Sequence, residues 1–128
     1  MSGRASDHFL WKEFYCPDAK MVPVSDLTLN HVEKLEKLRL AFGKPLRVNS
    51  GYRSPSWNAN VGGAERSMHL EFATDLAPTG GIDAESLHLI YRLGKELGFS
   101  GIGRYDTFVH LDCREFIGRT RAEWDNRT

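Results

Sequence analysis

Two short apolar segments of this chain carry ionisable side chains where a strand would be expected to pack in a sheet. Residues 72–77 (FATDLA) enclose Asp75, and residues 108–114 (FVHLDCR) enclose His110 and Asp112. Because strand side chains alternate between two faces, His110 and Asp112 share one face, roughly 6–7 Å apart along the strand. A buried aspartate costs free energy unless a metal ion or another cation satisfies it. The two segments therefore predict a sheet with one chemically active face.

Another ionisable side chain, His69, comes shortly before the first of these segments. Two histidines and one or two aspartates on adjacent strands can supply the three protein ligands of a catalytic zinc ion and leave a fourth position for water. The alternative is a polar strand face whose side chains hydrogen-bond to one another, and spacing alone leaves both interpretations open. The remaining histidines are expected to be less informative: His31 and His88 as helix-surface or boundary residues, and His8 in an irregular N-terminal segment.

The rest of the chain alternates between helical and extended patterns. Apolar side chains recur at three- and four-residue steps over residues 27–42, which predicts a helix that Asp26 caps and Gly43 ends. A second helix is predicted from its cap, Asp83, to Leu97. The predicted strands are residues 46–49, 72–77, 99–103 and 108–114, with mostly loop at 50–63 and a turn or short helix in the tail to about Trp124. This order is typical of an α+β domain with two main helices and a small, mostly antiparallel sheet.

The length and the charge balance limit what the protein can be. A chain of 128 residues corresponds to one domain, so we expect a single domain over residues 1–128. Lys and Arg number 17 and so do Asp and Glu, and the resulting net charge of zero argues against a nucleic-acid-binding protein. Two cysteines are too few for a disulfide scaffold, and we expect buried thiols. Four arginines crowd the C-terminal end, where a solvated tail is the simpler interpretation and a local basic patch the alternative: Arg114, Arg119, Arg121 and Arg127.

No stretch approaches the roughly 20 apolar residues that a membrane-spanning helix needs. The N-terminal sequence MSGRASDHFLWKEF has no apolar run of signal-peptide length. We therefore expect no membrane partner, synthesis in the cytoplasm and a monomeric protein.

Longer motifs around the ionisable residues resemble a known family. The segments SGYRSPSWNANVGGAERSMHLEFATDLAP and GIGRYDTFVHLDCRE, with the opening HFLWKEFYCPD, are similar to the zinc D-alanyl-D-alanine carboxypeptidase family. That family includes phage endolysins that cut L-alanyl-D-glutamate bonds, and it shares its folding unit with the hedgehog signalling domain. The resemblance spans about residues 8–124 and is closest to the small branch whose last motif is His-x-Asp. It implies a hedgehog/DD-peptidase-like fold, bound Zn²⁺ and a peptidoglycan peptide as partner.

The resemblance also implies roles for individual residues. His69 in SMH, Asp75 in ATD and His110 in VHLD match the three zinc ligands. Arg53 in SGYRS matches the arginine that faces the substrate and holds a carbonyl or carboxylate oxygen. Ser67, two residues before the first histidine, matches a position that supports the site by hydrogen bonding.

Two positions depart from the family pattern. Asp75 follows His69 by six residues instead of seven, and the glycine of the intervening turn is missing. The general-base glutamate that usually stands three residues before the last histidine is replaced by Thr107. Three carboxylates are candidates for the general-base role: Asp106, Asp112 and Glu71. Three aromatic residues flank these positions and are expected either to bind substrate or to pack in the core: Tyr52, Trp57 and Tyr105.

We therefore expect a zinc metallopeptidase that hydrolyses a peptide bond of bacterial peptidoglycan, as a D,D- or L,D-type carboxypeptidase or endopeptidase. An endolysin-like protein of this kind would act on the cell wall after release or as part of a virion. One alternative is a non-catalytic metal-binding domain of the same fold that binds a wall peptide or a protein partner. Another is a structural domain of a virion with a vestigial site.

Overall fold

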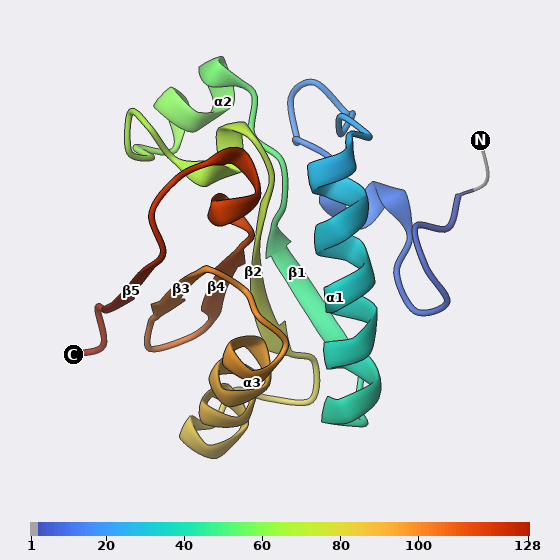
Figure 1. The fold of residues 1–128 in the computed structure, drawn as a ribbon, viewed down its shortest axis with the longest axis vertical. Coiled ribbons are helices and arrows are strands. Elements are labelled where there is room, and N and C mark those ends of the chain that lie inside the picture. The colour runs from blue at the N-terminus through green and yellow to red at the C-terminus, as the bar shows by residue number, and fades with distance from the viewer. Residues whose placement is uncertain (1–2) are drawn as a thin grey trace.

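A computed structural model describes residues 3–128 and shows a five-stranded sheet with helices packed beside it (Figure 1). The strand order is β1-β2-β4-β3-β5, and all neighbouring strands are antiparallel except the parallel pair β3 and β5. The elements are η1 Trp11–Phe14, α1 Asp26–Phe42, β1 Leu46–Ser50, α2 Pro55–Asn60, η2 Met68–Leu70, β2 Ala73–Pro78, α3 Ala84–Glu96, β3 Gly101–Arg104, β4 Val109–Asp112, η3 Arg114–Ile117 and β5 Ala122–Asp125. The predicted α+β class is confirmed. Within residues 3–128, no helix combines the length and the apolar character needed to cross a membrane.

The two faces of the sheet carry different kinds of side chains. One face carries fully buried apolar side chains, such as Leu76 of β2, Ile102 of β3 and Leu111 of β4, and it packs against the main helices. Because side chains alternate along each strand, the neighbouring residues Asp75 and His110 project from the opposite face. The hydrophobic core therefore holds the strands in register from one side and leaves the other side for a polar site.

The start of α1 differs by one residue from the prediction. Ser25 is the N-cap, and its Oγ accepts a hydrogen bond from the backbone N–H of Thr28 at 3.3 Å, whereas Asp26 lies in the first turn. A carboxylate in the first turn still interacts favourably with the positive end of the helix dipole. The helix ends at Gly43 as predicted, with φ of 78° that a glycine adopts without strain.

Two further segments differ from the prediction. The expected loop of residues 50–63 contains the short helix α2, which begins with Ser54 as N-cap and Pro55 in the first turn. The tail contains the short helix η3, as predicted, but its end forms the strand β5, which pairs in parallel with β3, Gly101 opposite Ala122 and Gly103 opposite Trp124. A four-residue edge strand has too short a pattern to be recognised without its partner.

Two glycines of β3 make room on the polar face of the sheet. Gly101 and Gly103 lie opposite Asp112 and His110 of β4. A Cβ at Gly101 would overlap the Asp112 carboxylate, and a Cβ at Gly103 would overlap the indole of Trp124. The absence of side chains on β3 therefore lets large groups from β4 and β5 lie against the sheet.

His31 was predicted as a surface or boundary residue, and this is wrong. Its imidazole is fully buried, lies edge-on to Phe72 and Phe99 at centroid distances of 4.7 and 5.0 Å, and has Nε2 2.9 Å from Thr74 Oγ1. Nδ1 has no hydrogen-bond partner in the described chain. Burial, which penalises the charged form, lowers the pKa of His31 to about 3. His31 is therefore a neutral core residue that joins α1 to β2.

We expect the free energy of unfolding to fall as the pH is lowered from about 6.5 toward about 3, because His31 takes up a proton only when the chain unfolds. The unfolded state binds more protons in this range, so stability rises with pH by about 1.4 kcal/mol per pH unit for one group. Urea unfolding at a series of pH values should show this slope in the wild type and a smaller slope in His31→Leu. His88→Leu, at an exposed position of α3, is the matched control. If the free energy of unfolding had the same pH slope in the wild type and in H31L, His31 would not be the group that titrates.

Candidate metal centre

Three ionisable side chains converge on the polar face of the sheet. Asp75 of β2 pairs directly with His110 of β4, and His69 comes from η2. Asp75 Oδ1 lies 3.2 Å from His69 Nε2 and 3.0 Å from His110 Nδ1. One ligand atom from each residue lies within 4.8 Å of the other two, and all three residues are buried. The spacing of six residues between His69 and Asp75 therefore still brings the two side chains together.

Hydrogen bonds behind the two imidazoles determine which nitrogen faces the centre. His69 Nδ1 lies 2.6 Å from the backbone oxygen of Gly51, which only accepts, so Nδ1 carries a hydrogen and Nε2 faces Asp75. His110 Nε2 lies 2.7 Å from Asp112 Oδ2, so that nitrogen donates and Nδ1 faces Asp75. Two imidazole nitrogens and a carboxylate oxygen thus point at one position, where a metal ion would take the place of the hydrogens that bond the nitrogens to Asp75. This donor set suits Zn²⁺, which binds imidazole nitrogen and carboxylate oxygen.

Charge and burial compete at the two aspartates. Burial would raise the pKa of Asp75, but hydrogen bonds from His110 and His69 outweigh it and hold the pKa below its usual range. The same competition lowers the pKa of Asp112, where the hydrogen bonds come from His110 and Arg114. Both carboxylates are therefore anionic near neutral pH, as a metal ligand and its hydrogen-bond acceptor must be.

Asp112 lies behind His110 and is itself held by Arg114. Its carboxylate accepts hydrogen bonds from Arg114 Nε at 3.0 Å and Arg114 Nη2 at 2.7 Å, a bidentate pair, and from the backbone N–H of Arg114 at 3.0 Å. The Asp112 side chain is fully buried. The sequence predicted that His110 and Asp112 share a strand face, which is confirmed, and the structure places Asp112 as the residue that orients the imidazole.

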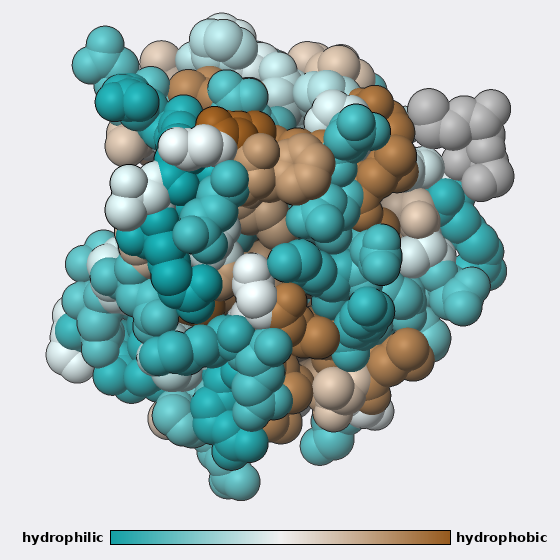
Figure 2. Space-filling model, in the orientation of Figure 1, coloured by the Kyte–Doolittle hydropathy of each residue, from teal (hydrophilic) through white to brown (hydrophobic). Residues whose placement is uncertain are grey.

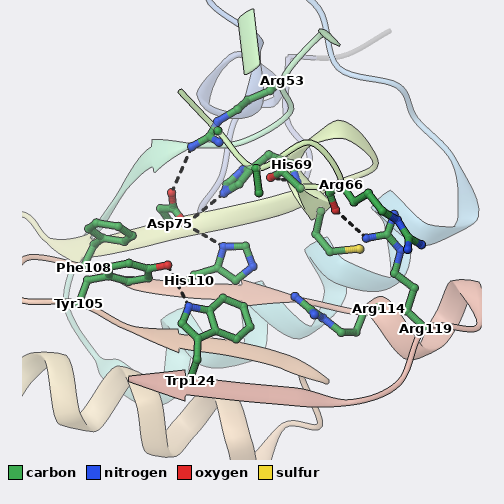
Figure 3. A pocket seen from close by; sticks show the side chains of 14 residues that line it. Arg53, Arg66, His69, Asp75, Tyr105, Phe108, His110, Arg114, Arg119 and Trp124 are labelled. Atoms are coloured by element: carbon green, nitrogen blue, oxygen red, sulfur yellow. Dashed lines mark hydrogen bonds and ion pairs between the residues drawn. The ribbon is translucent and has the colours of Figure 1, made fainter. Parts of the chain in front are cut away.

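A pocket of about 460 Å³ opens in front of the three residues (Figure 3). Arg53 lies on one side, with Nη2 3.9 Å from Asp75 Oδ2. Its guanidinium also donates to Ser50 Oγ and Asn58 Oδ1, both at 3.2 Å, which fixes its position. Ser67 lines the same pocket and accepts a hydrogen bond from the backbone N–H of His69 at 3.2 Å.

Aromatic side chains form another part of the pocket wall. Tyr105 stacks on Phe108 at a centroid distance of 4.3 Å, and Tyr105 Oη accepts a hydrogen bond from Trp124 Nε1 at 2.9 Å. That bond leaves the Tyr105 hydroxyl hydrogen available to a ligand. Trp124 also lies against His110, with centroids 5.1 Å apart. The sequence analysis missed Trp124 as a site residue because only the pairing of β5 with β3 brings it there.

Five of the predicted residues do not line this pocket: Asp106, Glu71, Tyr52, Trp57 and Asp112, which lies behind His110. Asp106 is exposed and accepts hydrogen bonds from the backbone N–H and the hydroxyl of Thr128, at 3.1 and 2.8 Å. Glu71 is exposed at the end of η2. Tyr52 is half-buried and packs against the core. Among residues 3–128, the carboxylate that lines the pocket is thus that of Asp75.

Trp57 lies in a second hollow, of about 380 Å³, beside the first. Tyr15 and Val61 line it as well, and Figure 2 shows apolar side chains gathered between α2 and the segment that precedes α1. Arg53 lines both hollows. Gly51, whose backbone oxygen bonds to His69, also lines the second hollow, so Trp57 lies beside the site and not in its pocket.

The C-terminal arginines are not simply a solvated tail. Arg114 and Arg119 line the pocket, together with Arg66 from the loop after α2. Arg121 and Arg127 are exposed and pair with nearby carboxylates. The clustering in the sequence was the available signal, but the chain path through η3 and β5 decides which of these side chains turn inward.

The fold and the converging side chains define a small α+β domain with a His–Asp–His cluster that can hold a metal ion. The chain belongs to the peptidase M15 family, whose model matches residues 7–112. It is also similar to a zinc D-Ala-D-Ala carboxypeptidase of Streptomyces albus G, with 53% identity over 38 residues. That alignment covers 29% of this chain and 15% of the relative, so it spans only a small part of the relative's length.

Asp112→Asn should weaken zinc binding about 10–100-fold, because the amide no longer supplies the anionic acceptor that fixes the His110 tautomer. Competition with a chelating dye measures the affinity, and thermal unfolding of the metal-free variant checks that it folds. Asp106→Asn is the control, since Asp106 bonds to Thr128 instead of a ligand. Equal zinc affinities for wild type and D112N would contradict this role.

Proposed function

We propose that this protein is a zinc-dependent peptidase that hydrolyses a peptide bond of bacterial peptidoglycan, in a single catalytic domain over residues 1–128. His69, Asp75 and His110 would hold the metal. The observation that carries the proposal is the convergence of two imidazole nitrogens and a carboxylate oxygen at the base of an open pocket. Membership of the peptidase M15 family and the similarity to an enzyme named for zinc and D-Ala-D-Ala support it.

The chemistry divides between the metal and the chain. Bound zinc would polarise a carbonyl group and lower the pKa of a water molecule toward about 7. Arg53, fixed by Ser50 and Asn58, would stabilise negative charge that develops on the carbonyl oxygen during attack. Tyr105 would donate its free hydroxyl hydrogen to the substrate, since Trp124 already supplies the hydrogen bond that its oxygen accepts. Ser67 supports the site through the backbone of His69.

Loss of the metal ligand should abolish activity. His110→Ala leaves two protein ligands, so we expect purified protein to lose stoichiometric zinc and to stop lowering the turbidity of purified cell walls. His88→Ala, at an exposed site on α3, should retain both properties. Lysis that is unaffected by a chelator or by H110A would refute the proposed function. Mass spectrometry of fragments released from defined muropeptides then identifies the scissile bond as D,D or L,D, and an endolysin role requires release of wall fragments from intact walls.

The general-base role is a separate question. The structure leads us to expect that Asp106→Asn keeps kcat/KM within about threefold of wild type, because Asp106 is bonded to Thr128 and zinc already acidifies water. Steady-state kinetics on a defined muropeptide measures this. A loss of about 100-fold or more would instead assign Asp106 as the proton acceptor, reached through a rearrangement of the C-terminal residues.

A second candidate function is a non-catalytic domain that binds metal and a wall peptide or a protein partner. The observation that favours it is the absence, among the described residues, of a free carboxylate beside the metal ligands: Asp112 is saturated by His110 and Arg114. Peptide binding with stoichiometric zinc and without any released amine would support this function over hydrolysis.

A further inference from the structure

The pocket in front of the metal ligands carries more positive charge than the scissile peptide bond requires. Four arginines line it: Arg53, Arg66, Arg114 and Arg119. Two of them face carboxylates within the protein. Arg53 lies 3.9 Å from Asp75, and Arg114 forms its bidentate pair with Asp112. The other two guanidinium groups are not neutralised in this way.

Arg66 and Arg119 face no carboxylate in the described part of the chain. The Arg66 side chain is exposed and makes no hydrogen bond or ion pair with any of residues 3–128. Arg119 is half-buried, and its Nη1 donates to the backbone oxygen of Arg66 at 2.9 Å. This bond uses one of the five donors of a guanidinium and leaves its charge uncompensated.

The two arginines reach the pocket from segments far apart in the sequence. Arg66 belongs to the loop between α2 and η2, and Arg119 to the loop between η3 and β5. Their shared hydrogen bond ties these loops together. In Figure 3 they lie on the side of the metal ligands away from Arg53. Two like charges that line one pocket repel each other, and an anion bound between them removes that cost.

We propose that Arg66 and Arg119 form an anion subsite that binds a carboxylate of the substrate peptide, separate from the bond that is cleaved. This proposal rests on the proposed peptidase function. A guanidinium presents paired donors that match the two oxygens of a carboxylate. The subsite and the metal ligands share one pocket, so a single peptide that places a carbonyl near Arg53 can reach the subsite with its carboxylate. The subsite would therefore select acidic peptides and set which peptide bond reaches the metal.

Two otherwise identical stem peptides test the subsite, one with a free carboxylate beside the candidate scissile bond and one with a carboxamide. Calorimetric titration of the chelator-treated protein measures binding without cleavage. We expect the wild type to bind the acid about 10-fold more tightly than the amide, as for a charge-assisted hydrogen bond. Arg66→Gln should remove most of this preference, and Arg66→Lys should restore part of it. Arg92→Gln, an exposed position on α3 with the same change in charge, should keep it.

The outcomes separate the subsite from the enzymatic function. The proposal is overturned if R66Q and R119Q discriminate between the peptides as the wild type does, or if the wild type binds neither peptide. Inorganic phosphate is the third ligand: tighter binding of phosphate than of the acidic peptide, lost in R66Q, would assign the subsite to a phosphate and overturn it as well. If zinc-loaded protein cleaves both peptides with equal kcat/KM, the subsite is refuted and the peptidase function is supported. If the protein binds the acidic peptide more tightly but cleaves neither peptide, the subsite is supported and the peptidase function is refuted.

Discussion

The cross-strand contact between Asp75 and His110 is the interaction on which the site depends. Antiparallel pairing of β2 with β4 puts the two residues directly opposite each other, and Asp75 Oδ1 then lies between His110 Nδ1 and His69 Nε2. A shift of either strand by one residue would turn its polar side chain into the core and bring its apolar side chains to the polar face. The apolar packing on the other face of the sheet therefore protects the site by making that shift costly.

Two buried imidazoles, His31 of α1 and His110 of β4, have pKa values shifted in opposite directions. Around His31, which hydrogen-bonds only to a neutral hydroxyl, burial dominates and lowers the pKa to about 3. Around His110, burial also favours the neutral form, but hydrogen bonds to Asp112 and Asp75 outweigh it and raise the pKa. The difference is the presence of two carboxylates in contact. One face of the sheet thus packs against a neutral histidine of α1, and the other carries a histidine held between two carboxylates.

The net charge of the whole protein differs from the charge that lines its pocket. Equal numbers of acidic and basic residues give a net charge of zero, yet four arginines and one aspartate line the cavity. Local charge of this kind governs what binds, because interactions between exposed charges beyond about 10 Å are screened by salt. The loops after α2 and η3 produce this concentration of charge, and they bring Arg66 and Arg119 together through one hydrogen bond.

The sequence by itself determined the α+β class, most strands and both main helices, because apolar periodicity and caps such as Asp83 act locally. It also predicted that His69, Asp75 and His110 come together, through strand alternation and the motifs that carry the family resemblance. Only the tertiary structure decided the burial of His31, the parallel strand β5, the saturation of Asp112 by Arg114 and the place of Trp124 in the pocket. All of these except the Asp112–Arg114 pair, which joins residues two positions apart, depend on a partner from a distant part of the chain. Local patterns do not encode such contacts, which form when the whole domain packs.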